Sequence, residues 1–139
     1  MYICKHFQIH ELVDPDTYNQ FAEAAWMFFC PAALQALDLL RDYFGAPIVV
    51  NNWRHGGEFK YRGFRPVMSS VGGNYSQHRM GRAFDLDVIG YTANEVRRTI
   101  IINKDMPSFR LINCLETDIN WVHFDTRNIS DRIRIVTPK

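Results

Sequence analysis

Residues 75–88 read YSQHRMGRAFDLDV, and the pattern of this stretch decides the fold. Its second half alternates apolar and acidic residues. A strand places alternate residues on opposite faces, so Asp85 and Asp87 project away from a buried layer. His78 precedes Gly81, where the chain can bend, and we expect the imidazole to lie on the approach to this strand. An imidazole and a carboxylate brought together in this way are two of the three protein ligands of an open zinc site.

The third ligand is predicted near the C-terminus, where residues 120–127 read NWVHFDTR. This run also alternates, and His123 lies on its polar face. Taken singly, each histidine could be a hydrogen-bonded core residue and the aspartate a turn carboxylate. Their joint spacing favours a metal site made by His78, Asp85 and His123, with room for water at the fourth position.

The motif Ser76-x-His78-x6-Asp85, followed by a Trp-x-His123 strand, resembles the D-alanyl-D-alanine carboxypeptidase-like zinc peptidases. These enzymes cut peptidoglycan stem peptides and share a fold with the hedgehog signalling domain. Residues 62–65, Arg-Gly-Phe-Arg, are similar to the Ser-Gly-Tyr-Arg element of the family. The resemblance covers residues 48–127. It implies an α+β fold with a central antiparallel sheet, helices on one face and a zinc cleft on the other.

The resemblance also implies two substrate-binding residues. Arg65 would hold a substrate carboxylate or carbonyl oxygen through its planar fork of donors, and Ser76 would add a hydroxyl. A loop salt bridge is the alternative role for Arg65. Residue 62 is arginine where the family has a small residue, and this changes the local surroundings of Arg65.

The base that takes a proton from the zinc-bound water is either Glu116 or Asp118. Family members place a Glu or His a few residues before the last ligand, and position 120 is asparagine. If an even-numbered turn joins two strands here, Glu116 pairs with Trp121 and shares a face with His123, diagonally at about 7–8 Å. A three-residue loop would reverse this parity, so Glu116 is favoured and Asp118 stays open. Asp87 and Asp125 are either partners that orient an imidazole or solvated strand carboxylates.

Alternation and helical periodicity predict the elements along the chain. Helices are expected over residues 17–29, 31–44 and 91–103, the last with a capping box from Thr92 to Glu95 and with Arg97 solvated. Strands are expected over 48–50, 84–88, 110–116, 120–126 and 132–136.

Length and charge limit the alternatives. A chain of 139 residues makes one domain, 1–139, and we expect a monomer. The net charge of +1 disfavours a nucleic acid or a membrane as partner, and it argues against a metal-dependent nuclease built on the Arg- and aromatic-rich loop 51–74. Three cysteines without CxxC spacing are expected to be buried in a reduced protein.

The sequence therefore predicts a zinc metallopeptidase whose partner is a peptidoglycan stem peptide and whose cofactor is Zn²⁺. It would act by attack of a zinc-bound water, as a D-Ala-D-Ala carboxypeptidase or an L-Ala-D-Glu endopeptidase. The alternative is a non-catalytic, zinc-containing binding module on the same fold. No signal peptide begins the chain, so we expect synthesis in a cytoplasm. Action on a cell wall would follow lysis, as for a phage endolysin, or incorporation into a virion.

Overall fold

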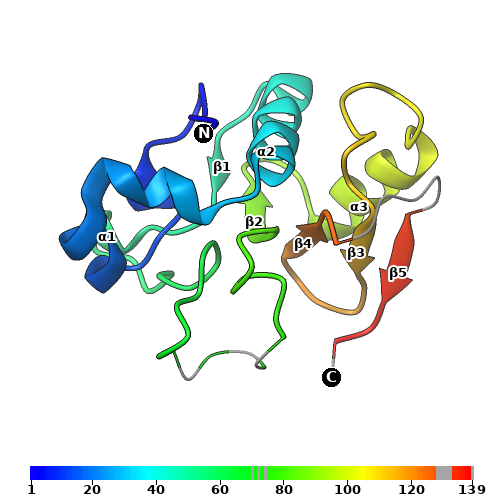
Figure 1. Cartoon of the computed structure of the whole chain (residues 1–139). Coiled ribbons are helices and arrows are strands. Elements are labelled where there is room, and N and C mark those ends of the chain that lie inside the picture. Colours follow the sequence, from blue (N-terminus) through cyan, green and yellow to red (C-terminus); the bar gives the residue numbers. More distant parts are fainter. Residues whose placement is uncertain (70, 72, 74, 128–132, 139) are drawn as a thin grey trace.

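A computed structural model, which describes residues 1–69, 71, 73, 75–127 and 133–138, has three α-helices and a mixed five-stranded sheet (Figure 1). The predicted α+β class is therefore confirmed. In chain order the elements are η1 (Ile9–Glu11), α1 (Pro15–Phe21), η2 (Ala22–Phe28), α2 (Pro31–Phe44), β1 (Ile48–Val49), η3 (Trp53–His55), β2 (Ala83–Val88), α3 (Ala93–Ile102), β3 (Cys114–Glu116), β4 (Val122–Asp125) and β5 (Arg134–Val136), where η denotes a 3-10 helix.

The strand order is β1-β2-β4-β3-β5. The first three pairings are antiparallel, as predicted for the central sheet, but β5 lies parallel to β3 at the sheet edge, so the sheet is mixed. In the sheet, β5 lies at the outer edge of β3, and β3 separates it from β4. Because β3 is antiparallel to β4 and parallel to β5, β5 runs in the direction opposite to β4. Of the strand predicted over 132–136, β5 contains residues 134–136 and not Ile133, and residue 132 lies outside the described residues.

The N-terminal helix is shorter than predicted. Asp14 caps α1 by accepting a hydrogen bond from the Thr17 N–H at 3.2 Å, and Pro15 occupies the first turn. A single helix over 17–29 is wrong, because the chain turns at Ala22 with φ of 46° and continues as the 3-10 helix η2. This change of direction accompanies the full burial of Trp26, at 2% exposure.

The other two helices follow the sequence signals. α2 begins at Pro31 and ends before Gly45, which adopts the left-handed conformation. α3 begins after Thr92, whose hydroxyl and the Glu95 carboxylate form the predicted capping box. Both helices contribute to one hydrophobic core with the apolar face of the sheet, where Phe84, Leu86, Leu115, Val122 and Phe124 are buried.

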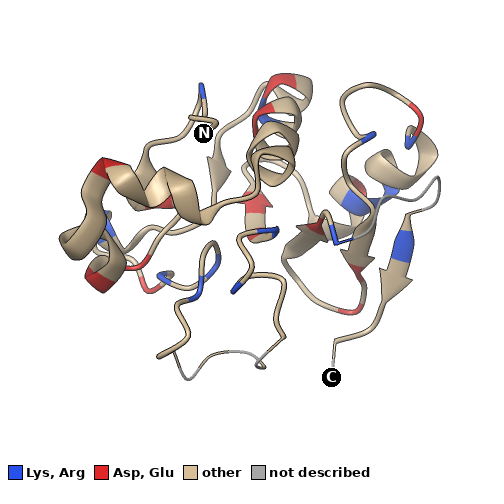
Figure 2. Cartoon of the chain, viewed as in Figure 1, with Lys and Arg blue, Asp and Glu red and all other residues tan. Residues whose placement is uncertain are grey.

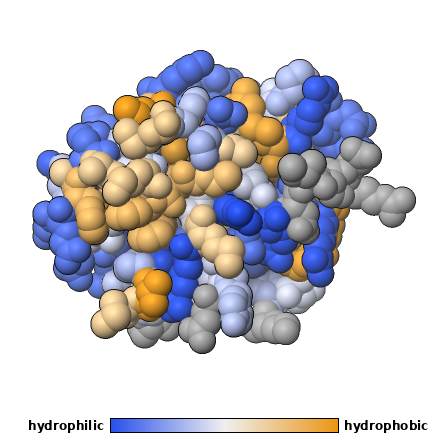
Figure 3. Space-filling view, viewed as in Figure 1, coloured by the Kyte–Doolittle hydropathy of each residue, from blue (hydrophilic) through white to orange (hydrophobic). Residues whose placement is uncertain are grey.

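Polar residues occupy the opposite face of β2 and β4. Asp85, His123 and Asp125 are buried there, which is unusual for charged side chains unless they are paired or bind a metal. Basic and acidic residues are otherwise interspersed along the chain (Figure 2). Apolar side chains gather over α1 and η2 on the face seen in Figure 3. Phe21 in α1 and Met27 in η2 are exposed. Among the described helices, none has the length and hydropathy that crossing a bilayer requires.

Candidate metal centre

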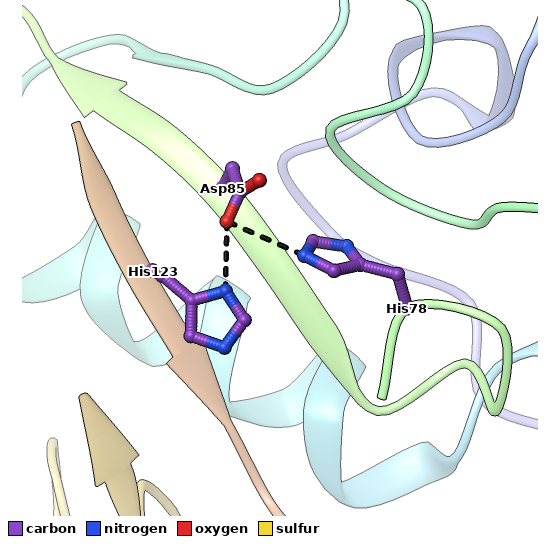
Figure 4. A group of neighbouring side chains, drawn as sticks. All are labelled: His78, Asp85 and His123. Atoms are coloured by element: carbon purple, nitrogen blue, oxygen red, sulfur yellow. Dashed lines mark hydrogen bonds and ion pairs between the residues drawn. The ribbon is translucent and has the colours of Figure 1, made fainter. Parts of the chain in front are cut away.

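His78, Asp85 and His123 meet where a loop approaches two paired strands, and their side chains point toward one another (Figure 4). Asp85 on β2 pairs with His123 on β4, so the two residues share a face. Oδ1 of Asp85 lies 2.8 Å from Nδ1 of His123 and 3.3 Å from Nε2 of His78. The donor atoms of all three residues lie within 4.8 Å of one another, and all three residues are buried.

The orientation of His78 is set by its own loop and by a distant backbone carbonyl. Nδ1 of His78 donates to the carbonyl oxygen of Gly63 at 2.9 Å, and its backbone N–H donates to Oγ of Ser76 at 3.2 Å. Gly63 packs so tightly that a Cβ there would overlap with the Leu12 carbonyl oxygen. Burial lowers the pKa of His78. The Gly63 carbonyl makes Nδ1 the donor nitrogen of the ring, so Nε2 is the nitrogen that faces Asp85.

Gly81 holds the turn after His78 against the start of α2. Its φ is 67°, and a Cβ there would overlap with the Phe28 carbonyl oxygen. The Gly81 carbonyl accepts a hydrogen bond from the Cys30 N–H at 2.9 Å. Only glycine combines this conformation with this close approach, so the bend predicted from the sequence is also a packing contact.

His123 is held on both sides by carboxylates. Nε2 of His123 lies 2.9 Å from Oδ2 of Asp125, which is fully buried. Arg127 donates to both carboxylate oxygens of Asp125, from Nε to Oδ1 at 2.8 Å and from Nη2 to Oδ2 at 2.6 Å. Burial acts to lower the pKa of His123, but the hydrogen bonds to Asp125 and Asp85 raise it to about 9. Burial acts to raise the pKa of Asp85, but the two imidazoles outweigh it and hold that pKa far below its usual range.

A comparison with protein families identifies the group to which this arrangement belongs. The model of the family described as Peptidase M15 matches residues 5–125, which include all three donors. The chain belongs to the peptidase M15 family. The match confirms the family inferred from the motif. Comparisons with curated proteins and with solved structures give no match.

M15 peptidases are zinc-dependent, and the donor set of this M15 chain fits zinc. Zinc–ligand bonds of about 2.0–2.2 Å in a tetrahedron space the donor atoms roughly 3.3–3.6 Å apart. The separations of 2.8 and 3.3 Å from Asp85 Oδ1 are close to that spacing. Two imidazole nitrogens and one carboxylate oxygen leave a fourth position open, as in catalytic zinc sites. His78, Asp85 and His123 are thus the residues that could hold the metal.

The three donors line a pocket of about 370 Å³ that also contains Arg65, Ser76 and Glu116. Nη2 of Arg65 donates to Oδ2 of Asp85 at 3.1 Å, and its Nε donates to the Tyr61 carbonyl oxygen. Arg65 therefore holds the carboxylate of the candidate ligand Asp85 and also lines the pocket. Ser76 caps the turn that carries His78, as described above, and lines the same pocket.

The structure places the two candidate bases differently. Oε1 of Glu116 lies 3.8 Å from Nε2 of His123, in the pocket. Asp118 lies in the β3–β4 connection with φ of 61° and is not among the described residues that line the pocket. The strand register is Cys114 to Asp125, which continues to Glu116 opposite His123. The expected pairing of Glu116 with Trp121 is therefore wrong by two residues, but the parity and the shared face are retained.

Two functional neighbours escape sequence reasoning. Arg127, two residues after Asp125, neutralises the carboxylate that holds His123, and the Asp-x-Arg spacing at the end of β4 was the available signal. Arg97 was expected in solvent but is buried. It donates to the Trp121 and Ile119 carbonyl oxygens at 2.8 and 3.0 Å and so anchors the β3–β4 connection to α3. No local pattern distinguishes Arg97 from exposed Arg98.

Proposed function

We propose that this M15 peptidase is a zinc metallopeptidase that hydrolyses peptide bonds in peptidoglycan stem peptides, of the D-Ala-D-Ala carboxypeptidase or L-Ala-D-Glu endopeptidase type. One observation carries the proposal. Two imidazole nitrogens and a carboxylate oxygen converge in a pocket, with a further carboxylate, Glu116, on the adjacent strand. When bound, zinc supplies a Lewis acid and a water molecule of lowered pKa.

The residues around the three ligands have separate tasks in this proposal. Glu116 accepts the proton of the attacking water, because its side chain faces the pocket and is 22% exposed. Arg65 and Ser76 bind the substrate carboxylate or carbonyl oxygen, since both line the pocket. Asp125 fixes the ring of His123 through Nε2, and its charge is balanced by Arg127.

The biological setting is part of the same proposal. We infer that the protein acts as a monomer, is made in a cytoplasm, and reaches the cell wall on lysis, as a phage endolysin does, or as part of a virion. The net charge of +1 supports the absence of a nucleic-acid partner, since such a partner would be attracted mainly by an excess of basic residues.

The first test is the zinc content of the purified wild type, the His123→Ala variant and a His6→Ala control. His6 pairs with Asp42 at 2.6 Å, away from the pocket. We expect about one zinc per chain in the wild type and the control, and a loss of zinc in His123→Ala. Equal zinc content in all three variants would show that His123 is not a ligand, and no zinc in any of them would remove the metallopeptidase proposal.

The second test separates catalysis from binding. Stem peptides are incubated with wild type, Glu116→Gln and the control Glu23→Gln, and products are identified by mass spectrometry. Glu23 lies on η2, where its carboxylate accepts from Trp26 Nε1. We expect Glu116→Gln to keep its zinc and to lose roughly 10²–10⁴-fold in kcat, with the control unchanged. Zinc binding without any cleavage by the wild type would instead favour the non-catalytic binding module.

A further inference from the structure

A second cavity of about 460 Å³ opens directly beside the metal pocket. The two cavities share Asp85 and Trp121 as lining residues, so they form neighbouring parts of one depression. The second cavity is otherwise lined by Phe59, Arg62, Asp87 and Asn120. None of these four residues takes part in the proposed chemistry, and their side chains are therefore available to select the substrate.

Asp87 places a carboxylate at a defined distance from the metal ligands. It follows Asp85 by two residues on β2, and residues two apart in a strand share a face. Their separation along the strand is about 6.6 Å, which is also the repeat of an extended peptide lying alongside. A substrate whose reacting bond lies at Asp85 therefore brings a side chain from a nearby residue to Asp87.

The open charge of this cavity is negative. Arg62 donates from Nη1 to Oδ2 of Asp87 at 2.9 Å, but only 11% of the Arg62 side chain is exposed, against 42% for Asp87. The Arg62 guanidinium carbon also lies 4.1 Å from the ring centroid of Phe59, which occupies one of its faces. Oδ1 of Asp87 has no hydrogen-bond partner among the described residues. More of the Asp87 side chain than of the Arg62 side chain is therefore exposed to a ligand in the cavity.

Aromatic side chains border the same carboxylate. Trp121 lies between the two cavities, and Phe59 is 40% exposed at the other side. Aromatic faces beside an open carboxylate suit an ammonium group carried on an aliphatic stem, since the stem packs on the rings and the charge meets the carboxylate. An acidic side chain would be repelled by Asp87, and an apolar one would leave the carboxylate desolvated without a partner.

We propose that this cavity is a substrate subsite for a side chain that ends in a primary ammonium, with Asp87 as its acceptor and Trp121 as its aromatic wall. This proposal rests on the proposed peptidase function. The third residue of a peptidoglycan stem peptide is a diamino acid, and one residue separates it from either bond considered above. The diamino acid lies on the amino-terminal side of the D-Ala-D-Ala bond but on the carboxyl-terminal side of the L-Ala-D-Glu bond, so this single subsite serves only one of the two cleavages.

The test compares two synthetic stem pentapeptides that differ only at the third residue, lysine in one and norleucine in the other. Binding is measured by calorimetry and cleavage by mass spectrometry, for wild type, Asp87→Asn and the control Asp105→Asn. Asp105 is 89% exposed and lies outside both cavities. We expect the wild type and the control to prefer the lysine peptide by about fivefold to tenfold, as one exposed ion pair and one cation–π contact allow.

In Asp87→Asn we expect the ratio of the two affinities, lysine peptide over norleucine peptide, to fall to nearly one. Equal binding of the two peptides by the wild type, or a preference that survives in Asp87→Asn, would overturn the subsite. The wild-type comparison needs no variant, so it stands even if Asp87→Asn folds poorly.

The two proposals fail in distinguishable ways. If the wild type cleaves both peptides equally well, the peptidase function stands and the subsite is wrong. If no peptide is cleaved but the lysine peptide binds more tightly and Asp87→Asn removes the difference, the subsite stands on a non-catalytic module. If the wild type neither binds nor cleaves either peptide, both proposals are wrong.

Discussion

Replacing Gly81 by alanine tests how the fold positions the loop ligand of the metal site. The residue has φ of 67°, and a Cβ there would overlap with the backbone carbonyl of Phe28. The left-handed conformation costs an alanine roughly 1–2 kcal/mol. Pushing a methyl group into packed backbone costs about 1–3 kcal/mol more, because a carbonyl cannot rotate away as a side-chain end can. The expected loss of stability is therefore about 2–5 kcal/mol.

The assay is urea and thermal unfolding with excess chelator, so that bound metal does not add to the stability. For a domain of this size the loss corresponds to a fall in Tm of roughly 8–20 °C. Gly45→Ala is the matched control, because Gly45 has φ of 59° but no atom within 4 Å of its Cβ position. Gly45→Ala should cost only the conformational part, roughly 1–2 kcal/mol. Equal losses in Gly81→Ala and Gly45→Ala would refute the argument from close approach.

Gly63→Ala completes this comparison. The backbone of Gly63 lies outside the left-handed region, but a Cβ there would overlap with the Leu12 carbonyl. This variant therefore isolates the packing cost, about 1–3 kcal/mol. Because the Gly63 carbonyl accepts from His78 Nδ1, we also expect weaker zinc binding in Gly63→Ala than in Gly45→Ala. Unchanged zinc affinity in Gly63→Ala would mean that this carbonyl does not orient the ligand.

Three further predictions follow from the contacts around the site. Asp125→Asn should weaken zinc binding roughly 10–100-fold, measured by competition with a chelator, and an unchanged affinity would remove Asp125 from the support of His123. In the metal-free protein the pKa of His123 is raised from 6.5 to about 9. The protonation of His123 therefore stabilises the metal-free fold by about 3 kcal/mol below pH ~6.5. This part of the free energy of unfolding is lost as the pH rises through about 9. Urea unfolding at the two ends of that range checks the sign, and greater stability at the alkaline end would contradict it. Arg97→Met should cost about 2–4 kcal/mol in thermal unfolding, because two carbonyls of the β3–β4 connection lose their donor, whereas Arg98→Met at the exposed neighbouring position should be nearly neutral.

Local patterns were sufficient for much of the fold. Proline and glycine mark the ends of α2, and the capping box marks the start of α3, because these residues act through their own backbone or that of near neighbours. The break at Ala22 was not predictable in this way, since alanine is a good helix former and carries no turn signal. The packing that buries Trp26 decides it.

Long-range geometry limited the prediction of the site in the same way. Parity along the strands was enough to place Glu116 on the face of His123, because side chains alternate with a period of two whatever the loop does. The register of β3 against β4 could not be predicted from parity, because it depends on the length of the β3–β4 connection. Arg97 anchors that connection to α3. The parallel direction of β5 likewise depends on which edge of the sheet is free, and the residues of β5 do not indicate which edge that is.

The sequence by itself determined the family, the α+β class and the three candidate metal ligands, because motif spacing and alternation are properties of neighbouring residues. Only the tertiary structure decided how those ligands are held and what lies beside them. The Gly63 carbonyl behind His78 and the Asp125–Arg127 pair behind His123 act through contacts that depend on three-dimensional packing. The carboxylate of Asp87 between aromatic side chains is the same kind of feature: its neighbours Phe59 and Trp121 lie far from it in the chain, and only folding brings them to one cavity.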